Sequence, residues 1–187
     1  MTRLVILGRP GVGKTTLVKR VAEHFPGLFR GFYTEEIREG RVRTGFWIVT
    51  LSGKRSVLAA KGGTSPLRVG EYAVFVEDFE RLVLPELEDA LEQRAALLVD
   101  EIGKMELFSR NFRKLLDALW KEAELLLATS RFPEIPEVQE LFARPGTMRF
   151  LLTPGNREEV FTRVRELIGE LTRGGGRGSS SRAPQQW

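Results

Sequence analysis

The chain has 187 residues, of which 42% are hydrophobic and 29% charged, and its formal net charge is +4. This length and composition predict one soluble globular domain with a sizeable core. The absence of cysteine excludes disulfides, zinc–thiolate sites and cysteine nucleophiles. No apolar run approaches the length of a membrane span and no signal-peptide pattern precedes the first expected strand, so we expect a cytoplasmic protein with no membrane partner.

The positive charge is concentrated at the C-terminus. Residues 173–187 contain three arginines, several glycines and serines, and no acidic residue. We expect a disordered basic tail there, behind a single domain at 1–172. Because the tail carries three of the four net charges, the body is left at about +1, which does not favour a nucleic-acid partner although the tail keeps one possible.

A short buried strand is predicted at 2–7, because residues 4–7 are all apolar, and a helix is expected at 15–24. The segment that joins this strand to this helix, and includes the start of the helix, has the spacing of a phosphate-binding loop. It consists of Gly8, Arg9, Pro10, Gly11, Val12, Gly13, Lys14, Thr15 and Thr16. Glycines let the backbone curl closely around an anion, and the helix start presents amide groups to it. We expect Lys14 to reach the terminal phosphates and the Thr15 hydroxyl to bind Mg²⁺.

The next part of the chain is rich in β-formers. Strands are predicted at 28–37, 46–51, 55–59 and 72–76. The second and third of these flank a Gly-containing turn, which predicts an antiparallel hairpin. The charged segment 38–43 is expected to be a turn, and the Gly-rich segment 60–71 a loop.

From residue 78 onward helices alternate with strands. Helices are predicted at 78–94, 109–122, 136–143 and 156–171, and strands at 95–99, 124–128 and 148–152. This alternation predicts an α/β three-layer sandwich with a mostly parallel sheet, helices on both faces and an inserted antiparallel hairpin. Ligands bind at the C-terminal ends of such strands, so the phosphate loop, Asp100, Glu101, Thr129 and residues 153–157 are expected to converge on one crevice.

The acidic pair at the end of the strand 95–99 is the expected partner of the phosphate loop. We expect Asp100 to hold Mg²⁺ and Glu101 to orient or deprotonate a water molecule, although a helix-capping role remains open for both. Thr129 contacts the γ-phosphate, holds the attacking water, or simply caps a helix or turn. Lys104 and Glu106 line the site or begin a solvated helix. Candidates for neutralising transition-state charge are Arg38, Arg41, Arg43, Arg131 and Arg157.

Five strings in this order resemble the cancer-related nucleoside-triphosphatase family, which also occurs in thermophilic archaea and bacteria. They are the phosphate loop and residues 31–38, 43–46, 100–107 and 156–157. The resemblance covers residues 3 to about 170, and Asp-Glu-Ile-Gly-Lys-Met-Glu at 100–106 is more diagnostic than the phosphate loop.

The resemblance implies an Mg²⁺-dependent hydrolase that releases phosphate from ATP, GTP and other nucleoside triphosphates. It also implies the RecA-like sheet of P-loop NTPases, with Glu101 as the carboxylate that activates water. Asn156 and Arg157 follow the last strand, where they are well placed to contact the base or ribose.

Three other interpretations stay open at this point. A nucleoside or nucleotide kinase uses the same loop but needs an acceptor pocket and a lid that excludes water. An ATPase stimulated by RNA or DNA would use the basic tail. A nucleotide-dependent switch would bind without appreciable turnover. We expect a monomer in each case.

Overall fold

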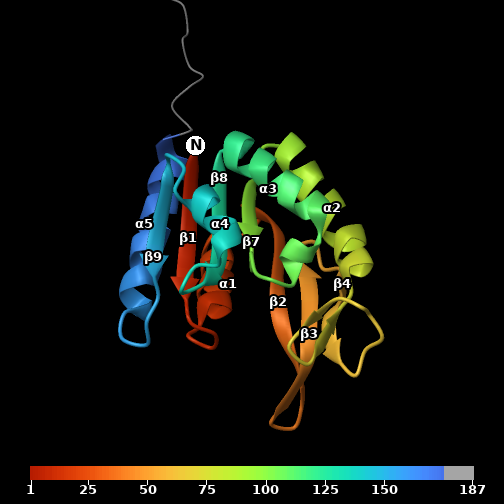
Figure 1. Ribbon diagram of the computed structural model, residues 1–187. Helices are drawn as coiled ribbons and strands as arrows, with labels where there is room; N and C mark the ends of the chain where they lie inside the picture. The colour runs from red at the N-terminus through yellow and green to blue at the C-terminus, as the bar shows by residue number, and fades with distance from the viewer. Residues whose placement is uncertain (175–187) are drawn as a thin grey trace, which may run out of the picture.

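The computed structural model describes residues 1–174, which form one nine-stranded sheet with the order β5-β6-β4-β3-β2-β7-β8-β1-β9 (Figure 1). The strands are β1 (Thr2–Gly8), β2 (Phe29–Glu39), β3 (Val42–Thr50), β4 (Arg55–Lys61), β5 (Arg68–Val69), β6 (Tyr72–Val74), β7 (Ala96–Val99), β8 (Leu125–Arg131) and β9 (Thr147–Leu151). The helices are α1 (Lys14–His24), α2 (Val76–Glu92), α3 (Arg110–Glu122), α4 (Pro136–Phe142) and α5 (Arg157–Gly174), with a 3₁₀ turn η1 (Glu106–Phe108).

The sheet is mixed, which corrects the prediction of a mostly parallel one. Strands β2, β7, β8, β1 and β9 pair in parallel with their neighbours. The remaining pairings, β2–β3, β3–β4, β4–β6 and β5–β6, are antiparallel and equal the parallel ones in number. The predicted insertion is therefore an antiparallel extension of the sheet beyond β2.

The predicted hairpin at 46–51 and 55–59 is confirmed as β3–β4, but a second hairpin precedes it. The predicted turn at 38–43 is wrong, because β2 continues to Glu39 and β3 begins at Val42. The turn itself holds only Gly40, at φ +61°, and Arg41. The charged residues on these strands lie on an exposed ribbon, where opposite charges pair across it and need no burial. The predicted loop 60–71 is partly wrong too, since it contributes the end of β4 and all of β5.

Two hydrophobic clusters cover opposite faces of the sheet and confirm the three-layer prediction. Alternate strand residues such as Val5 and Val99 pack with α2, α3 and α4. Their neighbours Leu4 and Leu98 pack with α1 and α5 on the other face. The parallel strands are buried on both sides, which explains why they appear in the sequence as continuous apolar runs.

The last helix runs two residues past the predicted domain boundary, because α5 includes Arg173 and Gly174. The rest of the predicted basic tail, residues 175–187, lies outside the described residues. None of the helices in residues 1–174 has the length and hydrophobicity needed to cross a bilayer.

Candidate active site

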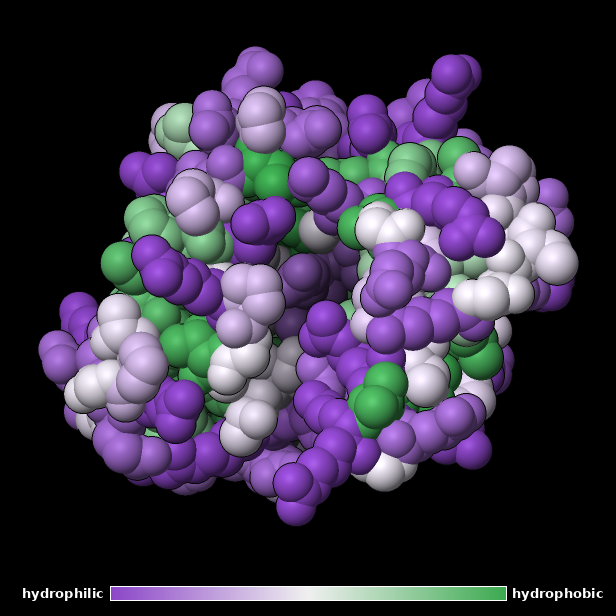
Figure 2. All heavy atoms as spheres, turned by 60° about the horizontal axis from the view of Figure 1, so that its bottom comes forward, coloured by the Kyte–Doolittle hydropathy of each residue, from purple (hydrophilic) through white to green (hydrophobic). Residues whose placement is uncertain are grey.

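The C-terminal ends of the parallel strands meet at one end of the molecule, where the β2–β3 hairpin also projects (Figure 1). Figure 2 shows this end with a hollow lined mostly by hydrophilic side chains. The phosphate loop joins β1 to α1 at this edge. Gly11 and Gly13 have φ of +79° and +107°, a left-handed conformation that favours glycine, so the spacing of the motif has a conformational cause.

Lys14 connects the phosphate loop to the acidic pair. Its side chain is only 7% exposed, and Nζ donates to the carbonyl oxygens of Gly8 (2.8 Å) and Arg9 (3.2 Å). The same Nζ lies 3.8 Å from Oε2 of Glu101. The loop lysine and the strand-end carboxylate therefore occupy one site, as predicted.

Asp100 is fully buried and accepts three hydrogen bonds from three different elements. Oδ2 accepts from Thr15 Oγ1 (2.7 Å) and from the Thr34 amide (3.3 Å), and Oδ1 accepts from the Thr129 hydroxyl. Burial raises the pKa of Asp100, while these hydrogen bonds and the charge of Lys14 act to lower it. The Thr15 hydroxyl and the Asp100 carboxylate thus lie side by side, and both are oxygen donors of the kind that Mg²⁺ prefers.

Thr129 does not reach the reacting end in the way that the sequence suggested. Its side chain is fully buried and its hydroxyl is used by Asp100. Thr129 is therefore a residue that positions Asp100, which corrects the expectation that it contacts the γ-phosphate.

Glu101 is the exposed member of the acidic pair, with a side chain 33% exposed. Burial of its carboxyl raises the pKa of Glu101, the charge of Lys14 opposes this, and the charge of Asp100 adds to it. Gly103 separates Glu101 from Glu106: a Cβ at Gly103 would lie 2.9 Å from Glu101 Oε1 and 3.0 Å from Glu106 Oε2. A side chain at this position would therefore press on both carboxylates, and one of them would have to move.

The loop after β9 contacts the phosphate loop instead of standing apart from it. Arg157 Nε donates to the Val12 carbonyl oxygen at 2.9 Å. The side chain of Asn156 is used locally, because Oδ1 accepts from the Thr153 amide and Nδ2 donates to the Leu151 carbonyl, each at 2.8 Å. Of the two residues expected near the base or ribose, Arg157 borders the phosphate loop, and Asn156 lies just before α5 with its side chain bonded to neighbouring backbone groups.

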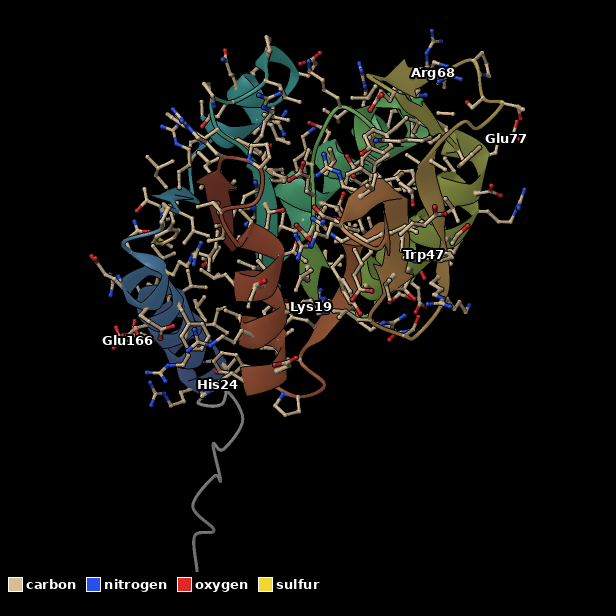
Figure 3. The ribbon with its side chains drawn as sticks, turned by 90° about the horizontal axis from the view of Figure 1, so that it is seen from below. Lys19, His24, Trp47, Arg68, Glu77 and Glu166 are labelled. Carbon is tan, nitrogen blue, oxygen red and sulfur yellow. The ribbon has the colours of Figure 1, made fainter. Side chains whose placement is uncertain are left out.

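Two contacts at this site were missed by sequence reasoning. The Thr34 amide bonds Asp100, and the string 31–38 contained Thr34 without indicating this role. Lys19 lies on α1 on the side that faces β2 (Figure 3): its Nζ is 2.9 Å from Glu35 Oε1 and 4.5 Å from the centre of the Tyr33 ring. The positions of Tyr33 and Glu35 in the sequence do not indicate which lysine contacts them in the folded protein.

Comparison with known proteins identifies the family to which this site belongs. A family model described as NTPase matches residues 3–165. The chain belongs to this NTPase family.

Relatives in the NTPase family match almost end to end. The nucleoside-triphosphatase THEP1 of Thermotoga maritima is 39% identical over 166 residues, which cover 89% of this chain and 95% of that protein. THEP1 of Aquifex aeolicus is 40% identical over 175 residues, covering 89% and 98%.

Two solved structures of this kind share the fold. The crystal structure of THEP1 from the hyperthermophile Aquifex aeolicus superposes with a TM-score of 0.82 at 39% identity, covering 89% of this chain and 99% of that one. The solution structure of a human cancer-related nucleoside triphosphatase superposes with a TM-score of 0.78 at 35% identity, covering 91% and 98%.

Proposed function

We propose that this protein is a nucleoside triphosphatase that hydrolyses ATP, GTP and other nucleoside triphosphates to the diphosphate and phosphate. Membership of the NTPase family and relatives named nucleoside-triphosphatase over most of the chain support the reaction class. The observation that carries the proposal is the placement of Glu101 Oε2 3.8 Å from Lys14 Nζ, beside the bonded pair of Thr15 and Asp100.

We further infer a P-loop NTPase fold of the RecA-like kind. In its support, the phosphate loop follows β1 and the acidic pair follows β7, two parallel strands of the sheet with β8 between them. This arrangement brings the triphosphate to the C-terminal ends of the strands. The amides of the loop and of the first turn of α1 would bind its phosphate oxygens.

Mg²⁺ is the cofactor that the ligand set fits, with Thr15 Oγ1 and Asp100 Oδ2 as its protein oxygens. When bound, the ion would neutralise charge on the β- and γ-phosphates. Thr129 and the Thr34 amide keep the Asp100 carboxylate in one orientation, so they would preorganise this pair of oxygens.

Glu101 is the residue that would accept the proton of the attacking water. Water would attack the γ-phosphorus, and the Lys14 ammonium group would stay in contact with the oxygens of the transferred phosphoryl group. Glu101 is one-third exposed, so a solvent molecule can reach its carboxylate, whereas Asp100 is sealed. Its raised pKa makes it a stronger base once it is ionised.

A kinase is the weaker alternative, because the relatives are named as triphosphatases. In our proposal the Glu101 carboxylate, next to Asp100, activates water and not an acceptor hydroxyl. Broad base specificity is part of our proposal, since the predicted base contact at Asn156 has its polar atoms bonded within the loop. We infer a cytoplasmic monomer that does not require nucleic acid for turnover, which gel filtration and assays with added RNA would test.

The Glu101→Gln variant tests the catalytic assignment. We expect kcat to fall by about 10²–10⁴-fold with nucleotide binding preserved, because the amide keeps the shape but cannot take a proton. The measurement is phosphate release from ATP, GTP, CTP, UTP and the diphosphates, with and without Mg²⁺.

Glu88→Gln is the matched control, because Glu88 is exposed on α2 away from the site. It should hydrolyse like the wild type. Turnover of Glu101→Gln within about threefold of the wild type would remove Glu101 from the role of base.

A further inference from the structure

The structure separates the five candidate arginines by what their guanidinium groups contact. Arg38 and Arg43 both bond Glu36, with Nε of Arg38 at 2.7 Å from Oε2 and Nη1 of Arg43 at 3.1 Å from Oε1. Arg41 is exposed in the turn between β2 and β3, where its carbonyl oxygen accepts from Arg38. Arg38 and Arg43 are thus paired with Glu36 within the hairpin, and the Arg41 side chain is exposed at its turn.

Arg157 contacts the phosphate loop through its Nε, which donates to the Val12 carbonyl oxygen. Arg131 differs from the other four candidates because its Nε is buried without a hydrogen-bond partner among residues 1–174.

Arg131 is the last residue of β8 and lies directly beside the start of the phosphate loop. Its Cα pairs in register with that of Gly8, and the next residue, Phe132, donates its amide to the Gly8 carbonyl oxygen at 3.0 Å. The backbone of Arg131 is therefore fixed beside the phosphate loop by the pairing of β8 with β1. A side chain on such a rigid element starts from a defined position.

The alternation of side chains along β8 places Arg131 on the nucleotide side of the sheet. Thr129 is two residues before it and directs its hydroxyl to Asp100, which also accepts from Thr15 of α1. Ser130, between them, faces the other way and donates to the Ile102 carbonyl oxygen at 2.7 Å. Because residues i and i+2 of a strand share a face, Arg131 shares the face of Thr129 and Asp100.

Two properties of the Arg131 guanidinium, a buried hydrogen-bond donor and a positive charge at the site, favour an anionic ligand. Its Nε is buried and has no hydrogen-bond partner in residues 1–174. A buried donor without an acceptor is costly, so this group is expected to bond a ligand or solvent oxygen. The positive charge of Arg131 also acts on the Glu101 carboxylate, together with that of Lys14.

We propose that Arg131 is a catalytic residue whose guanidinium contacts the γ-phosphate oxygens and neutralises the charge that develops on them during hydrolysis. The proposal rests on the function proposed above. In the step, the water oxygen bonds to the γ-phosphorus while the bond from phosphorus to the β–γ bridging oxygen breaks. The electron pair of that bond leaves with the nucleoside diphosphate, one water proton passes to Glu101, and Arg131 stays protonated throughout.

The test compares Arg131→Ala and Arg131→Lys with the wild type by single-turnover hydrolysis of ATP and by equilibrium binding of ADP. An arginine that stabilises this transition state contributes about 10³–10⁵-fold to kcat, so Arg131→Ala should lose a factor of that order. Arg131→Lys keeps the charge but loses the planar fork, so its rate should be intermediate. Affinity for ADP, which lacks the γ-phosphate, should stay within about twofold of the wild type in both.

Arg149→Ala is the matched control, because Arg149 lies on β9, where its exposed side chain pairs with Glu134. It should keep the wild-type rate. Thermal melting of each variant shows that it is folded, and Arg131→Lys remains a test if Arg131→Ala fails to fold.

An unchanged rate in Arg131→Ala, or an equal loss of ADP affinity and rate, would overturn the role of Arg131 while leaving the hydrolase intact. A wild-type protein that releases no phosphate would overturn the proposed function itself. Formation of a complex with ADP and aluminium fluoride, which mimics the transferred group, should be lost in Arg131→Ala and kept in Arg149→Ala.

Discussion

Three carboxyl groups lie near one another at the end of β7, and each has a different partner. Asp100 accepts three hydrogen bonds, and Glu101 faces the ammonium group of Lys14. Glu106 is also buried, but its Oε2 accepts from the Gly103 amide at 3.1 Å and no cation pairs with it in the described part of the chain. Burial and the negative charge of Glu101 therefore raise the pKa of Glu106 well above its ordinary value.

This raised pKa predicts a pH-dependent difference between the wild type and Glu106→Gln. The folded protein retains a proton that the unfolded chain releases above about pH 4.3, so the free energy of unfolding of the wild type falls as pH rises through this window. Glutamine keeps an acceptor for the Gly103 amide but does not titrate. Relative to the wild type, Glu106→Gln should gain stability as the pH rises from about 4.3 toward the raised pKa of Glu106.

Urea unfolding of both proteins across this range measures the difference, and groups shared by the two cancel. Glu88→Gln, on an exposed residue, should run parallel to the wild type. Parallel curves for Glu106→Gln as well would show that Glu106 ionises normally in the folded protein.

At the scale of elements, the strands β2 and β7 approach one another closely. Gly31 of β2 has φ +124°, and a Cβ there would lie 2.0 Å from the Leu98 carbonyl oxygen of β7. Its own carbonyl oxygen accepts from the Leu51 amide at 2.8 Å. Gly31 therefore lets β2 pack against β7 at the point where the antiparallel half of the sheet joins the parallel half.

Substitution of Gly31 by alanine should be strongly destabilising. The added Cβ meets backbone atoms and the left-handed φ is unfavourable, so we expect a loss of about 3 kcal/mol or more in the free energy of unfolding. Gly27→Ala is the matched control, because Gly27 also has a positive φ, +74°, but nothing within 4 Å of the added Cβ.

Gly27→Ala should cost only about 1–2 kcal/mol, the penalty for the backbone conformation alone. Chemical denaturation of both variants measures the two losses. Equal losses would mean that β2 can shift away from β7 without cost.

At the scale of the whole molecule, the site joins parts that lie far apart along the chain. The phosphate loop comes from the N-terminal strand, the acidic pair from the middle of the chain and Arg157 from the start of the last helix. A ligand that contacts all of them stabilises the folded state as a whole, because the unfolded chain does not bring them together.

Binding of ADP with Mg²⁺ should therefore raise the melting temperature. At a free concentration of about 100 times Kd the stabilisation is about 2.7 kcal/mol. For a chain of this size that corresponds to a rise of about 5–10 °C in Tm, measured by differential scanning fluorimetry.

Lys14→Ala provides the control, since Lys14 is the loop residue expected to contact the terminal phosphates. At the same ADP concentration its Tm should rise much less. A wild-type Tm that does not respond to ADP would contradict the proposed nucleotide site.

The sequence by itself determined the local parts of this protein. The phosphate loop, the strands β1 and β7 and the acidic pair were predicted where they occur. The strand β8 and the hairpin β3–β4 were predicted too, but β8 runs on to Arg131 and β3 begins earlier, at Val42. These features are visible in a sequence because they depend on neighbouring residues: glycine where φ is positive, and continuous apolar runs where a strand is covered on both faces.

Only the tertiary structure decided which distant groups meet. Asp100 receives its hydrogen bonds from Thr15, Thr34 and Thr129, which lie 85, 66 and 29 residues away along the chain. The extent of the antiparallel half of the sheet and the position of Arg131 beside Gly8 were equally hidden. Such contacts depend on strand order and register, which are set by packing of the whole sheet and are not encoded in any short segment.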